Sequence, residues 1–282
     1  MSVRMIQERF QSYACASAQE EDHALREITQ ELILAALSRT GFFARVLFQG
    51  GTCLRIFHGL NRFSEDLDFI LKTPDSNFGL TPFLNGIKSE LQAYGYRAEI
   101  TDRSSADSAV RKAFIKDDSL GKVLQFSFTA RSSSPKKVKV KIEVDVNPPG
   151  RSGADVRYLD FPFLASVAVQ DLPSLFAGKL HALLCREYIK GRDWYDFLWY
   201  TARGVVPNYQ HLSLALSQTG PWQGQEIEVD AAWVIHALTS AITRIDWKNT
   251  AADVRRFVPT SEHPSLELWS TELFLGQVHK IR

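Results

Sequence analysis

The sequence predicts an α/β protein in two parts, a core lobe built on a mixed sheet and a mainly helical lobe after it. Two observations in the first half favour a sheet: a strand that runs into two glycines and a helix near residue 50, and strand patterns with one polar face at 66–71 and 138–146. After Asn147-Pro-Pro-Gly150 the pattern becomes mostly helical. We therefore expect a core lobe over 1–153 and a helical lobe over 154–282, and 282 residues suffice for a large buried core.

The first element is an amphipathic helix. Residues 5–40 have a helical pattern with a polar interruption near 17–22. Apolar residues recur at spacings of three and four, which places them on one stripe: Ile28, Leu32, Ile33, Ala36 and Leu37. Gly41 follows where a helix-ending glycine is expected. We interpret this helix as a packing element.

The next element is a strand, a glycine turn and a short helix. Val46, Leu47 and Phe48 predict a strand end, Gly50-Gly51 follow, and Thr52 begins a helix with an apolar face. Two glycines let the backbone turn sharply and approach a ligand closely. The unpaired N–H groups of a helix start suit a phosphate. A tight turn without a ligand is the alternative interpretation.

A strand with paired carboxylates comes next, over Asp66–Leu71. Side chains alternate along a strand, so Asp66 and Asp68 share one face while the other face is apolar. Two adjacent carboxylates repel each other unless a cation lies between them. Oxygen ligands of this kind suit Mg²⁺ with water and substrate phosphates in its shell, although a solvated strand face is also possible.

The rest of the predicted sheet follows a loop at 73–79. We expect a helix over Pro82–Tyr94, ended by Gly95, and then strands at 97–101, 113–116, 123–130 and 138–146. The last strand alternates cleanly, with valines and Ile142 on one face and Lys139, Lys141, Glu143 and Asp145 on the other. A two-metal centre needs a third carboxylate from a neighbouring strand, and both Glu143 and Asp145 could supply it.

A basic cluster lies in and before this strand. It contains no acid and consists of Arg131, Lys136, Lys137, Lys139 and Lys141. It is either a solvated hairpin or a track for an RNA backbone.

The helical lobe begins with a short strand at 156–161. Ser174 could cap a helix that continues to about residue 189, and a second helix follows Gly191. Lys179 lies beside the apolar stripe of the first helix, where a lysine usually extends to solvent. Arg192 and Asp196 are four apart in the second helix, which is typical of a structural ion pair. The stretches near 231–243 and 265–278 indicate helices with packing roles.

Composition narrows the class of protein. The net charge of +1, with 45% hydrophobic and 23% charged residues, gives no global basic field, so any nucleic-acid binding depends on local patches. The three cysteines are scattered, which favours reduced thiols over disulfides or a zinc site. There is no apolar signal region and no apolar run near the ~18 residues of a membrane helix. We expect a cytoplasmic protein that makes no membrane contact.

The motifs resemble those of a known family. Gly50-Gly51-Thr52-x-Leu54-Arg55, followed by Arg62-x-Ser64-x-Asp66-Leu67-Asp68-Phe69, resembles the signature of polymerase-β-type nucleotidyltransferases. More narrowly, it is similar to the AbiEii/AbiGii toxin family of type IV toxin–antitoxin and abortive-infection systems. Lys141-Ile142-Glu143 is similar to a further family motif, which favours Glu143 as the third carboxylate. Lys179 and Arg192-Asp193-x-x-Asp196 are similar to the remaining motifs.

The resemblance implies a polymerase-β-like core and transfer of a nucleoside monophosphate from an NTP to an acceptor hydroxyl, with release of pyrophosphate. It implies two Mg²⁺ ions held by Asp66, Asp68 and Glu143. The implied nucleotide-binding residues are Gly50, Gly51, Thr52, Arg62, Ser64 and Lys179, with Asp193 as the acid that orients Lys179 and Asp196 as its alternative. It further implies tRNA as the acceptor, growth inhibition as the role, and a separate antitoxin of the transcriptional-regulator type as a partner.

Three other functions remain compatible with the sequence: a small-molecule nucleotidyltransferase of the antibiotic-modifying type, an inactive nucleotidyltransferase fold that serves as a binding module, and a metal-dependent nuclease. The sequence leaves open the NTP, the acceptor, the oligomeric state, activity or toxicity, and the role of 203–282.

Overall fold

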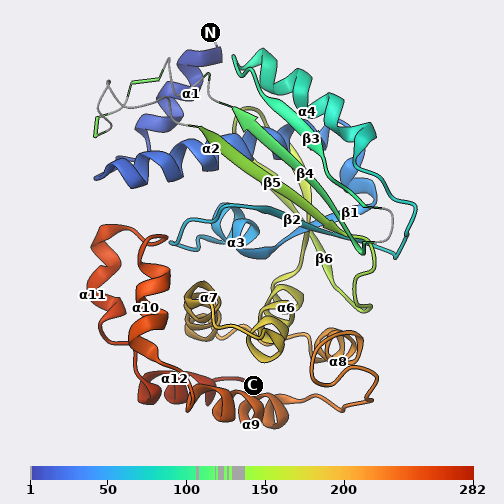
Figure 1. Cartoon of the computed structure of the whole chain (residues 1–282), viewed down its shortest axis with the longest axis vertical. Helices are drawn as coiled ribbons and strands as arrows, with labels where there is room; N and C mark the ends of the chain where they lie inside the picture. The colour runs from blue at the N-terminus through green and yellow to red at the C-terminus, as the bar shows by residue number, and fades with distance from the viewer. Residues whose placement is uncertain (1, 106–107, 118, 120–123, 126, 129–136) are drawn as a thin grey trace. The chain divides into compact units, whose positions relative to one another are not determined.

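The fold is organised around a mixed β-sheet (Figure 1). The computed structural model describes residues 2–105, 108–117, 119, 124–125, 127–128 and 137–282. Within these residues the sheet has seven strands in the order β3-β4-β5-β2-β1-β7-β6. The predicted α/β class with a mixed sheet is confirmed.

The chain forms two compact units. The first comprises Met1–Gly59, Phe63–Pro148 and Val156–Val169, and the second comprises Leu60–Arg62, Pro149–Asp155 and Gln170–Arg282. The sequence suggests a single division at residue 153. The chain instead passes between the units more than once, because a short segment before β2 packs with the second unit and 156–169 pack with the first.

The centre of the sheet carries the motifs. Strand β1 (Val46–Gln49) pairs antiparallel with β2 (Leu67–Leu71), and β2 pairs parallel with β5 (Val138–Asp145). Strand β4 (Val110–Asp117) pairs antiparallel with both β5 and β3 (Glu99–Asp102). Valines and Ile142 of β5 are buried on one face, as its alternation predicts. The polar side chains of β5 therefore share the face that carries the motif carboxylates of β2.

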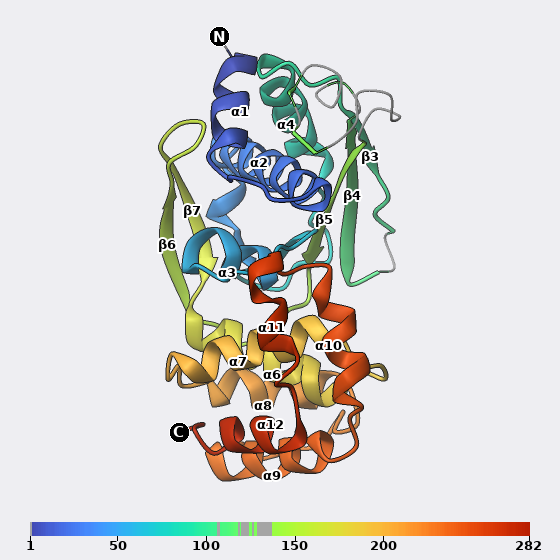
Figure 2. The same cartoon turned by 90° about the vertical axis from the view of Figure 1, so that its left-hand side faces the viewer.

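The other edge of the sheet holds a strand that the sequence interpretation missed. Strand β6 (Ala154–Leu159) covers most of the predicted strand, but β7 (Ala165–Gln170) was expected to be helical or irregular. In the sheet order β7 lies between β1 and β6, and it pairs parallel with β1. Figure 2 shows β6 and β7 side by side. Ala165, Val167 and Val169 are buried at every second position. This alternation is the signal that could have identified β7.

Helices cover the sheet of the first unit. Helix α1 (Ser2–Gln11) precedes α2 (Ala18–Ser38), which is capped by the Ser17 side chain and packs against β5 and α4 (Thr81–Ala93). The helix break therefore lies slightly before the predicted interruption. A short 3-10 turn, η1 (Phe42–Ala44), connects α2 to β1. Helix α3 (Gly50–His58) directly follows β1 and packs against β1 and β2.

The strand predicted over 123–130 is not formed by those of its residues that the structure describes. The strand expected over 123–130 lies partly outside the described residues. The described residues Leu124, Gln125, Ser127 and Phe128 form bends or irregular backbone. Three of them are held by α1 and α2: Gln125 exchanges hydrogen bonds with Gln7, and the N–H groups of Ser127 and Phe128 bind the Glu21 carboxylate.

The described elements of the second unit are helical, as expected for the second lobe. They are α6 (Leu172–Cys185), α7 (Gly191–Ala202), α8 (Tyr209–Gln218), α9 (Ala231–Ile242), α10 (Trp247–Arg255), η2 (Thr260–Glu262), α11 (His263–Leu266) and α12 (Thr271–Val278). Asp171, rather than Ser174, caps α6, because its side chain accepts the Ser174 N–H. Helix α6 also ends at Cys185, earlier than predicted.

Aromatic packing holds these helices together. Trp194 of α7 contacts Trp247 of α10 and Phe274 of α12, with ring centroids 5.1 and 5.4 Å away. The rings of Trp247 and Phe274 stack at 3.8 Å. These large buried rings give the second unit its own hydrophobic core. None of the helices, over the described residues, is long and apolar enough to cross a membrane.

A buried arginine stabilises loops beside the central strands. Arg111 of β4 is only 5% exposed. Its guanidinium donates hydrogen bonds to four backbone carbonyls, those of Ser76, Phe78, Ser105 and Ser108. It thereby joins the loop between β2 and α4 to the segment between β3 and β4. The fixed fork of five N–H donors suits this task, and a lysine ammonium could not reach all four acceptors.

We therefore expect Arg111→Lys to lower the free energy of unfolding by about 2–4 kcal/mol, because several carbonyls around the buried guanidinium lose their donor. Urea unfolding followed by tryptophan fluorescence measures this change. Arg97→Lys is the matched control, since Arg97 is exposed and should tolerate the change. A loss in Arg111→Lys no larger than in the control would contradict this role.

Candidate active site

The motif carboxylates lie on neighbouring strands at the centre of the sheet. Asp68 of β2 is in direct register with Glu143 of β5, and on the other side it is in register with Gln49 of β1. Glu143 is in turn in register with Lys112 of β4. Residues in direct register point to the same face of a sheet. Four adjacent strands therefore form one polar row, with two carboxylates in its middle.

A lysine lies among these carboxylates. The Lys141 Nζ is 2.7 Å from Glu143 Oε2 and 3.7 Å from Asp66 Oδ2. Lys112 Nζ lies 3.3 Å from the other oxygen of Glu143. Burial alone would lower the pKa of Lys141, but the hydrogen bond that it donates to Glu143 and the charges of Asp66, Glu143 and Asp68 raise it. The repulsion expected between the carboxylates is thus relieved by a cation supplied by the chain itself.

The donor set is of the kind that Mg²⁺ prefers. Asp66, Asp68 and Glu143 offer only carboxylate oxygens, and two of them already surround one ammonium group. Among the residues that the structure describes, no three His, Cys, Asp or Glu side chains are close enough together to hold a metal ion. The carboxylate oxygens are of the type that suits magnesium, but the three side chains are not gathered as a metal site in this structure, and Lys141 occupies the position between Asp66 and Glu143.

Gly50 permits the close approach of α3 to Asp68. The helix begins at Gly50, two residues earlier than predicted, and Gly50 has a left-handed φ of 78°. A Cβ atom at this position would lie 2.8 Å from Asp68 Oδ2. Any other residue would strain the backbone and push against the carboxylate. The first turn of α3, with N–H groups that have no intrahelical partner, thus lies against the acidic residue.

Thr52 connects the same helix to the start of β2. Its side chain is buried, and its hydroxyl donates a 2.5 Å hydrogen bond to the Asp66 carbonyl. The side chain therefore fixes the backbone at Asp66, and a contact with phosphate would have to come from backbone N–H groups of this turn. Ser64, another expected nucleotide-binding residue, is half-buried, and its carbonyl accepts a hydrogen bond from Gln30.

The two candidates for the third carboxylate have different surroundings. Asp145 is on the same face as Glu143, but its register partners are Ile70 and Val110, which are apolar. Its carboxylate accepts the Asn147 N–H, and burial raises its pKa. Glu143 instead lies beside Asp68 and contacts two lysines. The arrangement favours Glu143 over Asp145 as the partner of the two aspartates.

The expected basic cluster is divided by the structure. Arg131 and Lys136 lie outside the described residues. Lys137 is exposed, and the Lys139 Nζ lies 4.9 Å from the centroid of the Phe114 ring. Lys141 belongs to the carboxylate group instead, so it cannot also serve as part of a free basic track.

The second unit contains its own buried charge cluster. Lys179 of α6 lies 2.7 Å from Asp193 and 2.8 Å from Asp196, both of α7. Its side chain is 13% exposed, so the expectation that it extends to solvent is wrong. Arg62 makes two 2.6 Å hydrogen bonds to Asp196 and is buried. This contact favours a structural role for Arg62 over the expected role in nucleotide binding.

Opposite charges in this cluster shift the pKa values of Lys179 and Asp193 in the direction that favours their charged forms. Burial alone would lower the pKa of Lys179, but Asp193 and Asp196 raise it above its usual value. Burial would raise the pKa of Asp193, but Lys179 and Arg186 hold it below its usual range. The Asp196 carboxylate binds Arg62 and Lys179, and the guanidinium of Arg192 lies 4.2 Å from the centroid of the Phe257 ring.

The sequence interpretation missed several members of these two clusters. Lys112 and Gln49 could have been found only from strand register, since neither belongs to a motif. Arg186, which forms an ion pair with Asp193, is seven residues away from it across a helix break. Its only signal was its place between two motif segments.

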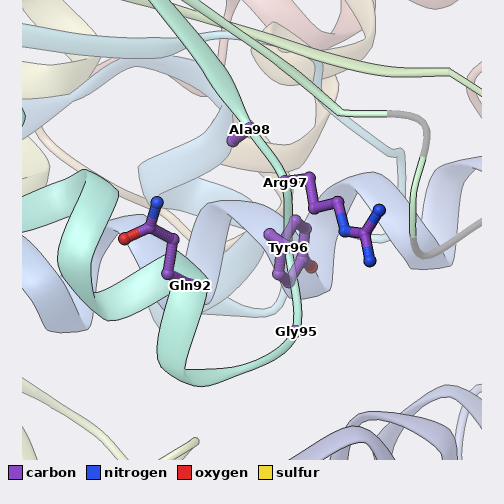
Figure 3. A pocket seen from close by; sticks show the side chains of 5 residues that line it. All are labelled: Gln92, Gly95, Tyr96, Arg97 and Ala98. Carbon is purple, nitrogen blue, oxygen red and sulfur yellow. The ribbon is translucent and has the colours of Figure 1, made fainter.

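A surface pocket in the first unit does not bring charged or reactive side chains of the described residues together. It is lined by Gln92, Gly95, Tyr96, Arg97 and Ala98, at the end of α4 (Figure 3). Gln92 and Arg97 extend away from each other, and the Tyr96 hydroxyl is hydrogen-bonded to Thr29. The segment leads into β3, which β4 and β5 separate from β2 in the sheet. No reactive groups of the described residues converge there.

Solved structures show where this fold occurs. The chain is similar to the crystal structure of JHP933 from Helicobacter pylori, with a TM-score of 0.52 and 16% identity over 91% of this chain and 88% of that one. It is also similar to a candidate nucleotidyltransferase from H. pylori, with a TM-score of 0.51 and 17% identity over 90% of this chain and 89% of that one. At these identities the likeness shows the fold alone.

Sequence comparison gives the family. No curated protein matches the chain. The family model described as nucleotidyl transferase AbiEii toxin, type IV TA system, matches residues 32–273, a range that contains the central strands and both charge clusters. The chain therefore belongs to the family of AbiEii nucleotidyltransferase toxins of type IV toxin–antitoxin systems.

Proposed function

We propose that the protein is a Mg²⁺-dependent nucleotidyltransferase that moves a nucleoside monophosphate from an NTP to a hydroxyl of an RNA acceptor, with tRNA as the acceptor that the resemblance implies. The observation that carries this proposal is the register of Asp68 with Glu143, with Asp66 and Glu143 gathered around one cation. Family membership supports the class of reaction.

The carboxylates perform the central task. Asp66, Asp68 and Glu143 would hold Mg²⁺, which neutralises phosphate charge and lowers the pKa of a bound hydroxyl. The acceptor oxygen attacks the α-phosphorus, the bond from that phosphorus to pyrophosphate breaks, and pyrophosphate leaves. Glu143 accepts the proton of the attacking hydroxyl. Lys112 and Lys141, on either side of Glu143, orient its carboxylate for this step.

Phosphate binding is the task of backbone and basic groups. The N–H groups of Gly50, Gly51 and Thr52 at the start of α3 suit the triphosphate, because a helix start combines unpaired donors with a positive dipole end. In the second unit, Lys179 would neutralise phosphate charge, and Asp193 would orient its ammonium group, as their 2.7 Å contact allows. We further propose that a separate antitoxin of the transcriptional-regulator type opposes the toxin.

The experiment that tests this function is a transfer assay. Purified protein is incubated with each labelled NTP in turn, Mg²⁺ and total tRNA, and label is sought on RNA after electrophoresis. We expect label from at least one NTP, and none with Asp68→Asn or without Mg²⁺. Label on no RNA with any NTP would contradict the tRNA acceptor, and equal labelling by Asp68→Asn would contradict the carboxylate mechanism.

Glu143 and Asp145 can be separated by conservative substitutions. Glu143→Gln should lower the transfer rate about 100-fold or more, because it removes a charge beside Asp68 and the proton acceptor. Asp145→Asn should lower it by no more than about threefold, since the amide oxygen can still accept the Asn147 N–H. Single-turnover rates measure both, and the reverse order of the two effects would show that Asp145 is the third carboxylate.

Gly50 offers a matched test of the close approach to Asp68. Gly50→Ala and Gly59→Ala both place an alanine at a left-handed φ, at 78° and 72°, so both should lose about 1–2 kcal/mol of stability. Only at Gly50 would the new methyl group meet a carboxylate oxygen; at Gly59 no atom of the described residues lies within 4 Å.

We therefore expect Gly50→Ala to lower the rate about 100-fold and Gly59→Ala to keep it nearly unchanged, measured at a temperature where both are folded. Equal activity in the two variants would mean that the approach of α3 to Asp68 has no role in the reaction.

A further inference from the structure

The charge cluster of the second unit reaches solvent at one of its members, Arg186. Its ion pairs connect three cations, Arg62, Lys179 and Arg186, to two carboxylates, Asp193 and Asp196. Arg62 and Lys179 are 3% and 13% exposed at the side chain, whereas Arg186 is 38% exposed. Arg186 is therefore the member of this cluster that an anion could approach from solvent.

Arg186 begins a short segment with an exposed aromatic ring. We call residues 186–190, between α6 and α7, the 186–190 loop. Tyr188 is 61% exposed and Ile189 is 51% exposed. The Lys190 Nζ lies 5.2 Å from the centroid of the Tyr188 ring. An exposed ring in contact with a basic side chain is a combination by which proteins bind single nucleotides and single-stranded nucleic acids.

Both ends of the 186–190 loop are fixed. The guanidinium of Arg186 is held by the buried Asp193 carboxylate, and its N–H binds the Ala182 carbonyl at 3.3 Å. At the other end, the Gly191 N–H binds Asp253 at 2.8 Å. A Cβ atom on Gly191 would lie only 2.1 Å from the Thr250 carbonyl oxygen, so this glycine packs directly against α10. Fixed ends reduce the entropy that the loop would lose on binding a ligand.

We propose that the 186–190 loop binds one nucleotide unit, with the base stacked on Tyr188 and the phosphate held by Arg186 and Lys190. The inference rests on the proposed function, because the nucleotide is either the NTP or a residue of the RNA acceptor. Both sources offer the same chemistry, an aromatic base next to a phosphate. Asp193 contacts both Arg186 and Lys179, so it connects this nucleotide site to the lysine that we propose neutralises phosphate charge.

Binding measurements on the full chain test the proposal. The probes are a fluorescein-labelled single-stranded oligoadenylate of about 10 nucleotides, followed by anisotropy, and each NTP, followed by equilibrium dialysis. Tyr188→Ala should weaken binding of at least one probe about 10-fold, and Tyr188→Trp should restore it, because a larger ring stacks at least as well. Tyr158→Ala is the control, since Tyr158 of β6 is 67% exposed and should have no effect.

The pattern of losses identifies the source of the nucleotide. If Tyr188→Ala weakens binding of oligoadenylate alone, Tyr188 contacts the RNA acceptor. If it weakens binding of an NTP, Tyr188 contacts the nucleotide donor. The proposal is overturned if Tyr188→Ala binds both probes as tightly as the wild-type protein. It is also overturned if Tyr188→Trp restores binding of neither probe, or if the wild-type protein binds neither probe. Binding is measured without turnover, so a failed transfer assay with normal effects of Tyr188 would reject the proposed reaction and keep the nucleotide site.

Discussion

The interaction on which the structure of the candidate site depends is the pairing of β2 with β5. This parallel register places Asp68 beside Glu143, although the two residues are far apart in the chain. Carboxylates on neighbouring strands repel each other, and three features of the fold stabilise their arrangement. Lys141 and Lys112 supply positive charge, Thr52 fixes the backbone at Asp66, and Gly50 allows the start of α3 to approach Asp68.

The same arrangement explains why a divalent cation is a reasonable occupant. A site that already gathers carboxylates around an ammonium group has the charge that Mg²⁺ requires and has its donors in neighbouring positions. We propose that the ion takes over the neutralising role that Lys141 has in the structure. Lys141 would then serve as an internal counterion that relieves the repulsion between the carboxylates of Asp66 and Glu143 between reaction cycles.

Much of the fold and part of the site could be predicted from the sequence, for physical reasons. The alternation of β5 and the Asp-x-Asp of β2 are local patterns, so their strands and polar faces follow from side-chain periodicity alone. Strand β7 has the same alternation, but its small residues were mistaken for part of the helical lobe. Lys112, Arg186 and the pairing of Arg62 with Asp196 depend on contacts between distant segments, which no local pattern contains. Lys179 shows the opposite error. Its apolar neighbours in the sequence suggested a side chain that extends to solvent, but in the structure the side chain is mostly buried and paired with Asp193 and Asp196.

The central claim is that Asp66, Asp68 and Glu143 form one cation site, and direct metal binding tests it most simply. Mn²⁺ can replace Mg²⁺ at oxygen sites and is detected by electron paramagnetic resonance. We expect the full chain to bind Mn²⁺ in the presence of a non-hydrolysable NTP, and the double variant Asp66→Asn/Asp68→Asn, still folded, to lose that binding. Wild-type protein that binds no Mn²⁺, or a double variant that binds it equally well, would contradict the account.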